Sequence, residues 1–261
     1  MDAGMRTPLL DFFKRGDVAR DIRLLAAQGA LAPRAHEQMG LLVLLVADSD
    51  PEIAAAAETT LSAIPRGSIE AFLARPDVPS EISKFFALRG IAAAPGGSEI
   101  PDAPLVDVSP EVEAEPDGDE VPEGKEREAT LQKIAAMNVA QRIALAMKGS
   151  REERAILIRD PNKIVGVAVL SSPKMSDQEI ESIAKMPTIS DEILRMIANT
   201  RGWIKSYPVA LALTKNPKTP LAVSMNLLQR LNDRDMRMLS TDRNVPEVLR
   251  VTARKKVVME R

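Results

Sequence analysis

Residues 173–184 (PKMSDQEIESIA) and residues 187–198 (PTISDEILRMIA) repeat one pattern without a gap. Each copy begins with a proline, which cannot continue a preceding helix, and three residues later comes a serine, Ser176 or Ser190. A serine at this position can accept a hydrogen bond from a free amide in the first turn of a new helix. Apolar residues then recur at helical spacing, so the pattern predicts two short amphipathic helices joined by a proline turn.

The same punctuation recurs elsewhere in the chain. Residues 217–220 (PKTP), residues 76–79 (PDVP) and residues 244–246 (NVP) predict further helix starts, and residues 167–174 (VAVLSSPK) match residues 211–218 (LALTKNPK) at an offset of 44 residues. No segment alternates convincingly between apolar and polar residues as a half-buried strand does. Because short helices cannot bury their apolar sides alone but can do so when stacked, the sequence predicts an all-α, α-solenoid-like fold.

Two of these segments also carry a resemblance to known proteins. At residues 159–176 (RDPNKIVGVAVLSSPKMS) and 214–228 (TKNPKTPLAVSMNLL) the chain resembles leucine-rich-repeat-variant and HEAT-like α-helical repeat proteins, which share DP and NP-x-x-P punctuation. The resemblance covers about residues 150–258, and more loosely residues 33–90. It implies an interaction surface and supplies no catalytic residue, and the Cys-ligated Fe–S cluster of some leucine-rich-repeat-variant proteins has no ligands here because the chain has no cysteine.

Charge and composition divide the chain into three parts. Residues 1–90 carry 10 basic and 12 acidic side chains, residues 91–130 carry 2 and 12, and residues 131–261 carry 23 and 13. Within this pattern, residues 92–128 contain six prolines, four glycines and no aromatic residue, a composition that cannot bury enough apolar surface to offset chain entropy. We therefore expect a disordered acidic linker there, between an N-terminal helical repeat domain at residues 6–91 and a C-terminal one at residues 129–258.

The composition argues against most enzymatic chemistry. The chain has no cysteine and one histidine, His36, which excludes thiol catalysis and cysteine metal sites and removes the usual histidine-based catalytic pairs. It also has no glycine-rich phosphate loop, and carboxylate pairs such as Asp233 with Asp235 lie at predicted helix starts, where the helix dipole favours anions. We expect a protein that is not an enzyme and has no catalytic residue, cofactor or metal.

Nothing in the sequence predicts a targeting or membrane segment. The first ten residues lack a basic region followed by a long apolar stretch, so we expect no signal peptide. The longest apolar run, residues 41–47 (LLVLLVA), is much shorter than the roughly 20 residues that cross a bilayer. We therefore expect a cytoplasmic protein that does not bind membranes.

The strongest candidate for a binding site is residues 201–207 (RGWIKSY), which contain the single tryptophan and the single tyrosine of the chain. If this segment is one helix, Trp203 and Tyr207 lie one turn apart on the same side. The predicted partner-binding residues are Arg201, Trp203, Lys205, Tyr207, Lys215 and Lys218. The alternative is that Trp203 fills the core between helices and the lysines are ordinary surface charge.

Function is harder to derive than fold. We expect a scaffold or adaptor whose repeat surface binds another protein, because stacked helices form an extended face rather than a deep pocket. The alternative is nucleic-acid binding by the C-terminal block, where residues 201–261 carry 13 basic and 5 acidic side chains. A helical-repeat enzyme using carboxylates in a cleft is a third hypothesis. The acidic linker is also expected to contact the basic C-terminal block within the same chain.

Overall fold

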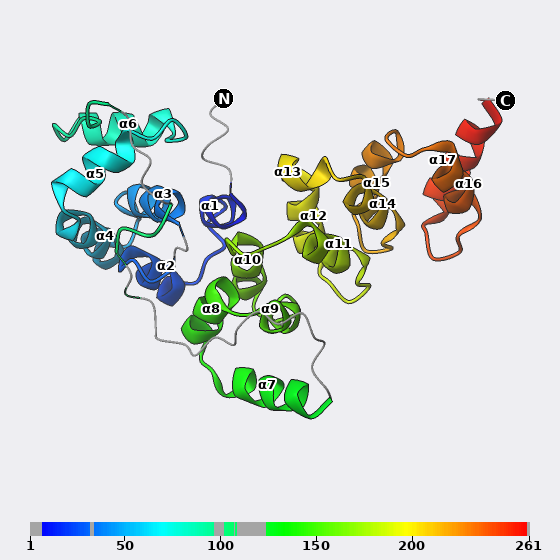
Figure 1. Ribbon diagram of the computed structural model, residues 1–261, viewed down its shortest axis with the longest axis horizontal. Helices are drawn as coiled ribbons and strands as arrows, with labels where there is room; N and C mark the ends of the chain where they lie inside the picture. The colour runs from blue at the N-terminus through cyan, green and yellow to red at the C-terminus, as the bar shows by residue number, and fades with distance from the viewer. Residues whose placement is uncertain (1–6, 32–33, 97–101, 107, 109–123, 260–261) are drawn as a thin grey trace. The chain divides into compact units, whose positions relative to one another are not determined.

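The chain folds into α-helices joined by turns. The computed structural model describes residues 7–31, 34–96, 102–106, 108 and 124–259, and within these ranges it contains helices and no strand (Figure 1). The prediction of an all-α fold is therefore confirmed. Contacts group the chain into two compact units, Met1–Lys174 (unit 1) and Met175–Arg261 (unit 2). The expected domain limits, residues 6–91 and 129–258, rest on composition and stay a prediction.

Unit 1 begins with six helices. They are α1 (Pro8–Lys14), α2 (Arg20–Ala27), α3 (Ala35–Leu45), α4 (Pro51–Ala63), α5 (Arg66–Leu73) and α6 (Ser80–Ala87). Residues 50–52 (DPE) predict a helix start with Asp50 as its cap. The structure confirms this cap, since Asp50 Oδ1 accepts a hydrogen bond from the amide of Glu52 at 3.0 Å. Helix α1 was not predicted individually, although Thr7 accepts a hydrogen bond from the amide of Leu10 at 3.3 Å and Pro8 follows at the first helical position.

Four more helices complete unit 1: α7 (Gly124–Ala136), α8 (Val139–Lys148), α9 (Arg151–Leu157) and α10 (Lys163–Ser171). The apolar residues from Leu131 to Met147 recur at helical spacing and predict one helix over residues 131–147. This prediction is wrong, because the range is divided between α7 and α8. Asn138 begins a new helix, because its side chain accepts a hydrogen bond from the amide of Gln141 at 2.9 Å while the Gln141 side chain accepts one from the amide of Asn138 at 3.0 Å. Residues 150–153 (SREE) also match the capping-box pattern. The structure confirms this box, with distances of 3.3 Å from the Glu153 amide to the Ser150 hydroxyl and 2.8 Å from the Ser150 amide to the Glu153 carboxylate.

The expected linker differs from the structure at both ends. Residues 102–106 lie against α3, and α7 begins at Gly124, inside the range that composition marked as disordered. Residues 109–123 lie outside the described residues, so their predicted disorder and their predicted contact with the basic C-terminal block stay predictions. Helix α1 packs on both α3 and α10, which joins the helices before and after this segment within unit 1.

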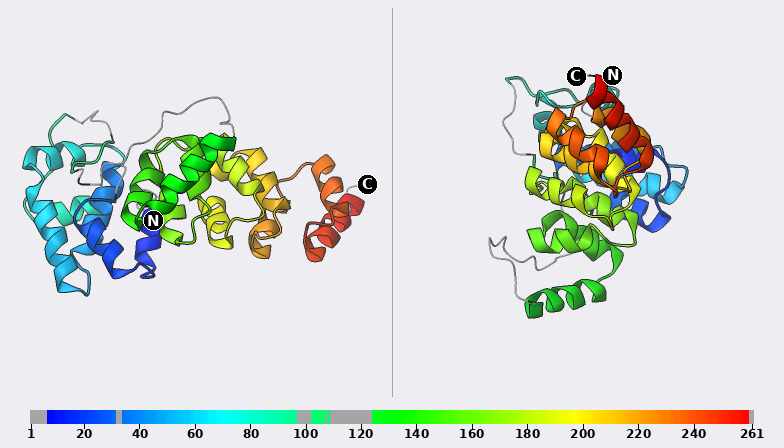
Figure 2. Two further views of the ribbon diagram at one scale, coloured as in Figure 1. Left: turned by 90° about the horizontal axis from the view of Figure 1, so that it is seen from below. Right: turned by 90° about the vertical axis from the view of Figure 1, so that its right-hand side faces the viewer.

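Unit 2 contains α11 (Asp177–Lys185), α12 (Asp191–Asn199), α13 (Arg201–Ile204), α14 (Tyr207–Lys215), α15 (Leu221–Leu228), α16 (Asp233–Thr241) and α17 (Glu247–Met259). The predicted serine caps are confirmed, since Ser176 accepts a hydrogen bond from the amide of Glu179 at 3.3 Å and Ser190 accepts one from the amide of Ile193 at 3.4 Å. Packing largely follows chain order: α14 contacts α11 and α15, and α17 contacts α15 and α16 (Figure 2).

A turn of one kind recurs at the helix ends of both units. In each case an oxygen of a polar side chain, within three residues of the end of a helix, accepts a hydrogen bond from the amide two residues further on, at 2.8 to 3.4 Å. The accepting residues are Asp48, Asp160, Ser172, Asn216 and Asp242. Side chains of this type compete for the backbone and favour a turn over continued helix, so they separate one helix from the next.

Two of these turns also reach an earlier helix through an arginine. Arg23 on α2 pairs with Asp48 at 2.5 Å, and Arg142 on α8 pairs with Asp160 at 2.5 Å. The side chains of both aspartates are almost completely buried. Helix α2 packs on α3 and α4, and α8 packs likewise on α9 and α10. The group α2, α3 and α4 and the group α8, α9 and α10 therefore share the same helix contacts and the same arginine–aspartate pair, which no sequence pattern predicted.

Two other turns reach an earlier helix through its main chain. The Ser172 hydroxyl donates to the carbonyl oxygen of Met147 at 2.9 Å, and Asn216 Nδ2 donates to that of Ala184 at 2.8 Å. These carbonyls lie in the last turns of α8 and α11, where the helix leaves them without internal partners. Ser172 and Asn216 occupy equivalent positions in the predicted 44-residue match, so its two copies share this contact as well as their sequence.

Candidate functional site

The structure places Trp203 and Tyr207 on different helices. Helix α13 ends at Ile204 and α14 begins at Tyr207, so the expectation that the two rings share one side of a single helix is wrong. Trp203 is half-buried, as is Tyr207. The two aromatic residues therefore do not form the face that the sequence spacing suggested.

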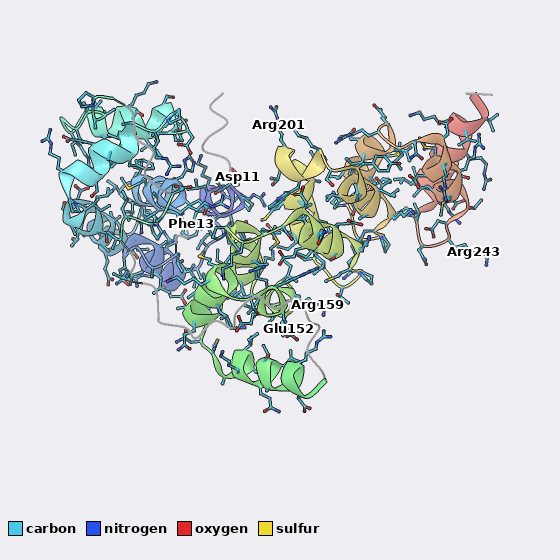
Figure 3. All side chains as sticks on the ribbon, viewed as in Figure 1. Asp11, Phe13, Glu152, Arg159, Arg201 and Arg243 are labelled. Carbon is cyan, nitrogen blue, oxygen red and sulfur yellow. The ribbon has the colours of Figure 1, made fainter. Side chains whose placement is uncertain are left out.

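The predicted basic residues are distributed over several elements of unit 2. Arg201, Lys205 and Lys218 are exposed, whereas Lys215, at the end of α14, is half-buried. Figure 3 shows the Arg201 side chain on α13, away from Arg243 on the loop between α16 and α17. Of the six residues predicted from the sequence, the structure brings Tyr207 and Lys215 together in one groove.

This groove, the unit 2 groove, has a volume of about 880 Å³. Its walls come from α11, from α14 and from three inter-helix turns, so it follows the helix ends. The lining residues are Glu181, Lys185, Pro187, Tyr207, Pro208, Leu211, Ala212, Lys215, Asn216, Pro217, Asp242 and Asn244. Arg201, Trp203, Lys205 and Lys218 are not among them.

One side of the groove is fixed by Asn216, which is 4% exposed. Its Nδ2 donates to the carbonyl oxygens of Ala184 at 2.8 Å and Met186 at 3.0 Å, and its Oδ1 accepts a hydrogen bond from the amide of Lys218 at 3.0 Å. These bonds join the end of α14 to the end of α11. Because the Asn216 amide is engaged on both its nitrogen and its oxygen, it shapes the groove and is not available to a ligand.

Tyr207 fixes a second side. Its hydroxyl donates to Asp235 Oδ2 at 2.5 Å and accepts a hydrogen bond from the amide of Asn232 at 3.2 Å. Its ring packs against the buried core of α15, α16 and α17. Burial raises the pKa of Tyr207, and the hydrogen bond to Asp235 raises it further, so the phenol stays protonated at neutral pH. Tyr207 therefore links α14 to the start of α16, and it is also one of the residues that line the groove.

The charged groups of the groove are of both signs. Lys185 Nζ forms a salt bridge with Glu181 Oε1 at 2.5 Å, and Asp242 Oδ1 accepts a hydrogen bond from the amide of Asn244 at 2.9 Å. Within the described part of the chain, Lys215 forms no salt bridge. Its ammonium group is consequently the one lysine charge of the lining that a ligand carboxylate can pair with directly.

Most of the lining was missed by the sequence analysis. Leu211, Lys185 and Asp242 come from three separate elements, and their approach depends on how α11, α14 and the turn after α16 pack. The available signal was the 44-residue match, which places an equivalent turn at Ser172 and Asn216 and so marks the helix ends where the groove forms. Packing positions of this kind are not readable from a local pattern.

The structure also bears on two other classes of site. Within residues 7–31, 34–96, 102–106, 108 and 124–259, no three histidine, aspartate or glutamate side chains cluster as a metal site requires. Among the same residues, no helix combines the length and apolar character needed to cross a bilayer.

The comparisons with known proteins are a separate finding. Comparison of this chain with protein-family models, with curated proteins and with solved structures gives no match. The resemblance to leucine-rich-repeat-variant and HEAT-like repeats therefore stays a prediction.

Proposed function

We propose that this protein is a non-catalytic helical-repeat adaptor that binds an extended segment of a partner protein in the unit 2 groove. The repeats are of the α-solenoid type in this proposal, supported by the recurrent helix-end turns and by packing that largely follows chain order within unit 2. A cytoplasmic location fits a chain without cysteine.

The composition of the groove lining carries the proposal. Leu211 and the prolines Pro187 and Pro208 offer apolar contact, and Lys215 next to them offers a positive charge without a salt bridge among the described residues. This combination favours a partner segment in which a carboxylate stands beside apolar side chains. Glu181 and Asp242 also line the groove, and their carboxylates disfavour a ligand that presents a continuous row of phosphates.

Selection from a library of random 12-residue peptides displayed on phage, with the full chain as bait, tests this proposal. The selected peptides are expected to place Asp or Glu beside apolar residues and to bind Lys215→Glu about tenfold more weakly than the unsubstituted chain. Lys218→Glu makes the same charge change at an exposed position outside the groove lining and serves as the matched control. Absence of selected peptides, or equal binding by Lys215→Glu, Leu211→Glu and Lys218→Glu, contradicts the proposal.

A second candidate function is nucleic-acid binding by unit 2, which a different observation favours. From residue 201 to residue 256 the chain has 12 lysines and arginines, and among described residues none of them forms a salt bridge. Their charges extend from Arg201 to beyond Arg243 (Figure 3). For a labelled 20-nucleotide single strand of RNA or DNA, the logarithm of the binding constant should then fall steeply with the logarithm of salt concentration. No binding at low salt, or a flat salt response, rejects this candidate.

A further inference from the structure

A short non-helical segment of unit 1, residues 102–106 (DAPLV), lies beside α3 and is here named the strap (Figure 1). The strap is held by the side chain of Gln38, which is 1% exposed. Gln38 Oε1 accepts hydrogen bonds from the amides of Leu105 at 2.7 Å and Val106 at 3.0 Å, and its Nε2 donates to the carbonyl oxygen of Val106. One buried amide therefore binds both donors and acceptors of the strap main chain.

The strap carboxylate is bound at the start of the same helix. Asp102 Oδ1 accepts a hydrogen bond from the amide of His36 at 3.1 Å and another from Arg75 Nη1 at 2.8 Å. The carbonyl oxygen of Asp102 accepts a third from the amide of Ala35 at 3.4 Å. A single strap residue thus accepts hydrogen bonds from two amides of the first turn of α3, which have no partner within the helix, and from one nitrogen of Arg75, whose other nitrogens pair with Asp77.

The apolar end of the strap lies beside Gly29, two residues after the end of α2. Gly29, which ends this helix region with a φ of +86°, has no side chain, and a Cβ at its position would lie 3.5 Å from Val106 Cγ1. Val106 and Leu105 are both half-buried. A Cβ at that distance makes ordinary van der Waals contact, so it is the left-handed backbone of Gly29, and not the space beside Val106, that makes glycine the favoured residue at this position.

These contacts are of the kind that can bind a peptide segment through its main chain. The hydrogen bonds go to the main chain, which every peptide offers, and selectivity comes from one carboxylate position and two apolar positions. If the strap left, Gln38 Oε1 would lose the two amides that donate to it, and the amides of Ala35 and His36 would lose their hydrogen bonds to Asp102. The loss of these hydrogen bonds favours refilling of the site.

We propose that this surface of α2 and α3 is a peptide-binding site that the chain's own strap occupies. Its ligand class is a partner segment that adopts the strap conformation and in which a carboxylate is followed three and four residues later by apolar side chains. The site is in unit 1 and is independent of the unit 2 groove, so its failure leaves the adaptor proposal standing. Because the strap is covalently attached, a free peptide competes with a local concentration on the order of millimolar.

A labelled peptide of residues 100–108 (IPDAPLVDV), titrated by fluorescence polarisation, tests this site in the full chain. The strap variant Asp102→Ala/Leu105→Pro/Val106→Pro removes the carboxylate and both amides that Gln38 binds. We expect it to bind the labelled peptide at least about tenfold more tightly than the unsubstituted chain does, because the internal competitor has been weakened.

Two changes then locate the binding. Gln38→Ala in the strap variant should weaken the peptide by about tenfold or more, whereas Gln178→Ala, at an exposed glutamine of unit 2, should leave it unchanged. A peptide with alanine in place of its first aspartate should also bind about tenfold more weakly, and this comparison leaves the protein untouched. Equal binding of the peptide by the strap variant and the unsubstituted chain, or equal binding of both peptides, overturns the proposal.

Discussion

Asn216 donates a hydrogen bond from its side-chain nitrogen to the carbonyl oxygen of Ala184 at 2.8 Å, across 32 residues of chain. The two residues belong to the ends of α14 and α11, which form the walls of the unit 2 groove. Asn216, which follows the last residue of α14, thus also donates hydrogen bonds to carbonyl oxygens at the end of α11. Unit 2 contains the single tryptophan, Trp203, so its fluorescence reports unfolding of this unit separately from the circular dichroism of the whole chain.

Asn216→Ala should lower the free energy of unfolding of unit 2 by about 1–3 kcal/mol. The substitution leaves the carbonyls of Ala184 and Met186 without the donor they have in a buried environment. Urea titration followed by Trp203 fluorescence measures the effect. Asn244→Ala, at an exposed position of the same groove lining, is the matched control and should change stability by less than about 0.5 kcal/mol.

Tyr207→Phe tests the link between α14 and α16. Loss of the hydroxyl removes the hydrogen bonds to Asp235 and Asn232 while keeping the ring in the core, so unit 2 should lose about 1 kcal/mol of stability. A double-mutant cycle with Asp235→Asn isolates the pair. Additive effects of the two substitutions would show that the hydroxyl and the carboxylate are not coupled.

Tyr207 also makes the stability of unit 2 depend on pH in alkaline solution. Its folded-state pKa is raised above the ordinary value of about 10, so its contribution is complete below pH 10 and is lost as pH rises through the folded-state pKa. Between pH 9 and pH 12, roughly, the unsubstituted protein should therefore lose more stability than Tyr207→Phe. Urea midpoints at each pH measure the difference, and parallel curves for the two proteins contradict it.

Glu37 on α3 should make unit 1 less stable as pH rises through neutrality. It is 1% exposed, and burial raises its pKa to about 7, with nearby Asp102 adding to the rise while Thr7 and Arg34 oppose it. The neutral acid is favoured in the folded state, so this contribution is complete below about pH 4.5 and is lost as pH rises through about 7.

Glu37→Gln keeps the shape and removes the charge, so it should be more stable than the unsubstituted chain at pH 8, by up to about 3 kcal/mol, and the advantage should disappear near pH 4.5. Thermal unfolding followed by circular dichroism at several pH values measures this. Glu81→Gln, on the exposed side of α6, is the control and should show no such crossover. An advantage that does not change with pH would disprove the assignment to Glu37 ionisation.

Gly149 should not tolerate a side chain. A Cβ at this position would lie 2.5 Å from the carbonyl oxygen of Leu145 and 2.7 Å from Glu153 Oε2, within the capping box that begins α9. Gly149→Ala should therefore lower the free energy of unfolding of unit 1 by about 1–3 kcal/mol. Gly202→Ala, where the structure leaves open space in α13, should be neutral or slightly stabilising, and equal effects of the two substitutions would refute the predicted clash.

The sequence predicts features that depend on neighbouring residues. The caps at Asp50, Ser150, Ser176 and Ser190 were all predicted, because a cap and its amide are two or three residues apart. The break before α8 was missed although Asn138 and Gln141 form the same kind of box. Apolar residues continue at helical spacing across the break, so the spacing taken alone predicts one continuous helix.

Features that join distant segments were not predictable in this way. Gln38 and Val106 are 68 residues apart, and nothing in either segment alone indicates that a buried amide binds the strap. Composition predicts that residues 102–106 cannot form a core of their own, but it does not show that another helix binds them. The separation of Trp203 from Tyr207 has a local origin, since the chain leaves the helix at Lys205 and Ser206.

The helix-end turns restrict how this chain can change in length. Ser172 and Asn216 each accept a hydrogen bond from the amide two residues further on and donate one to an earlier helix, Ser172 through its single hydroxyl and Asn216 through Oδ1 and Nδ2. The position of each side chain is therefore defined from both directions. Inserting one residue between α14 and Asn216 would rotate the following helix and pull the side chain away from α11. Insertions and deletions are therefore expected to be tolerated as whole segments that contain both partners, such as α11 to Asn216, rather than as single residues.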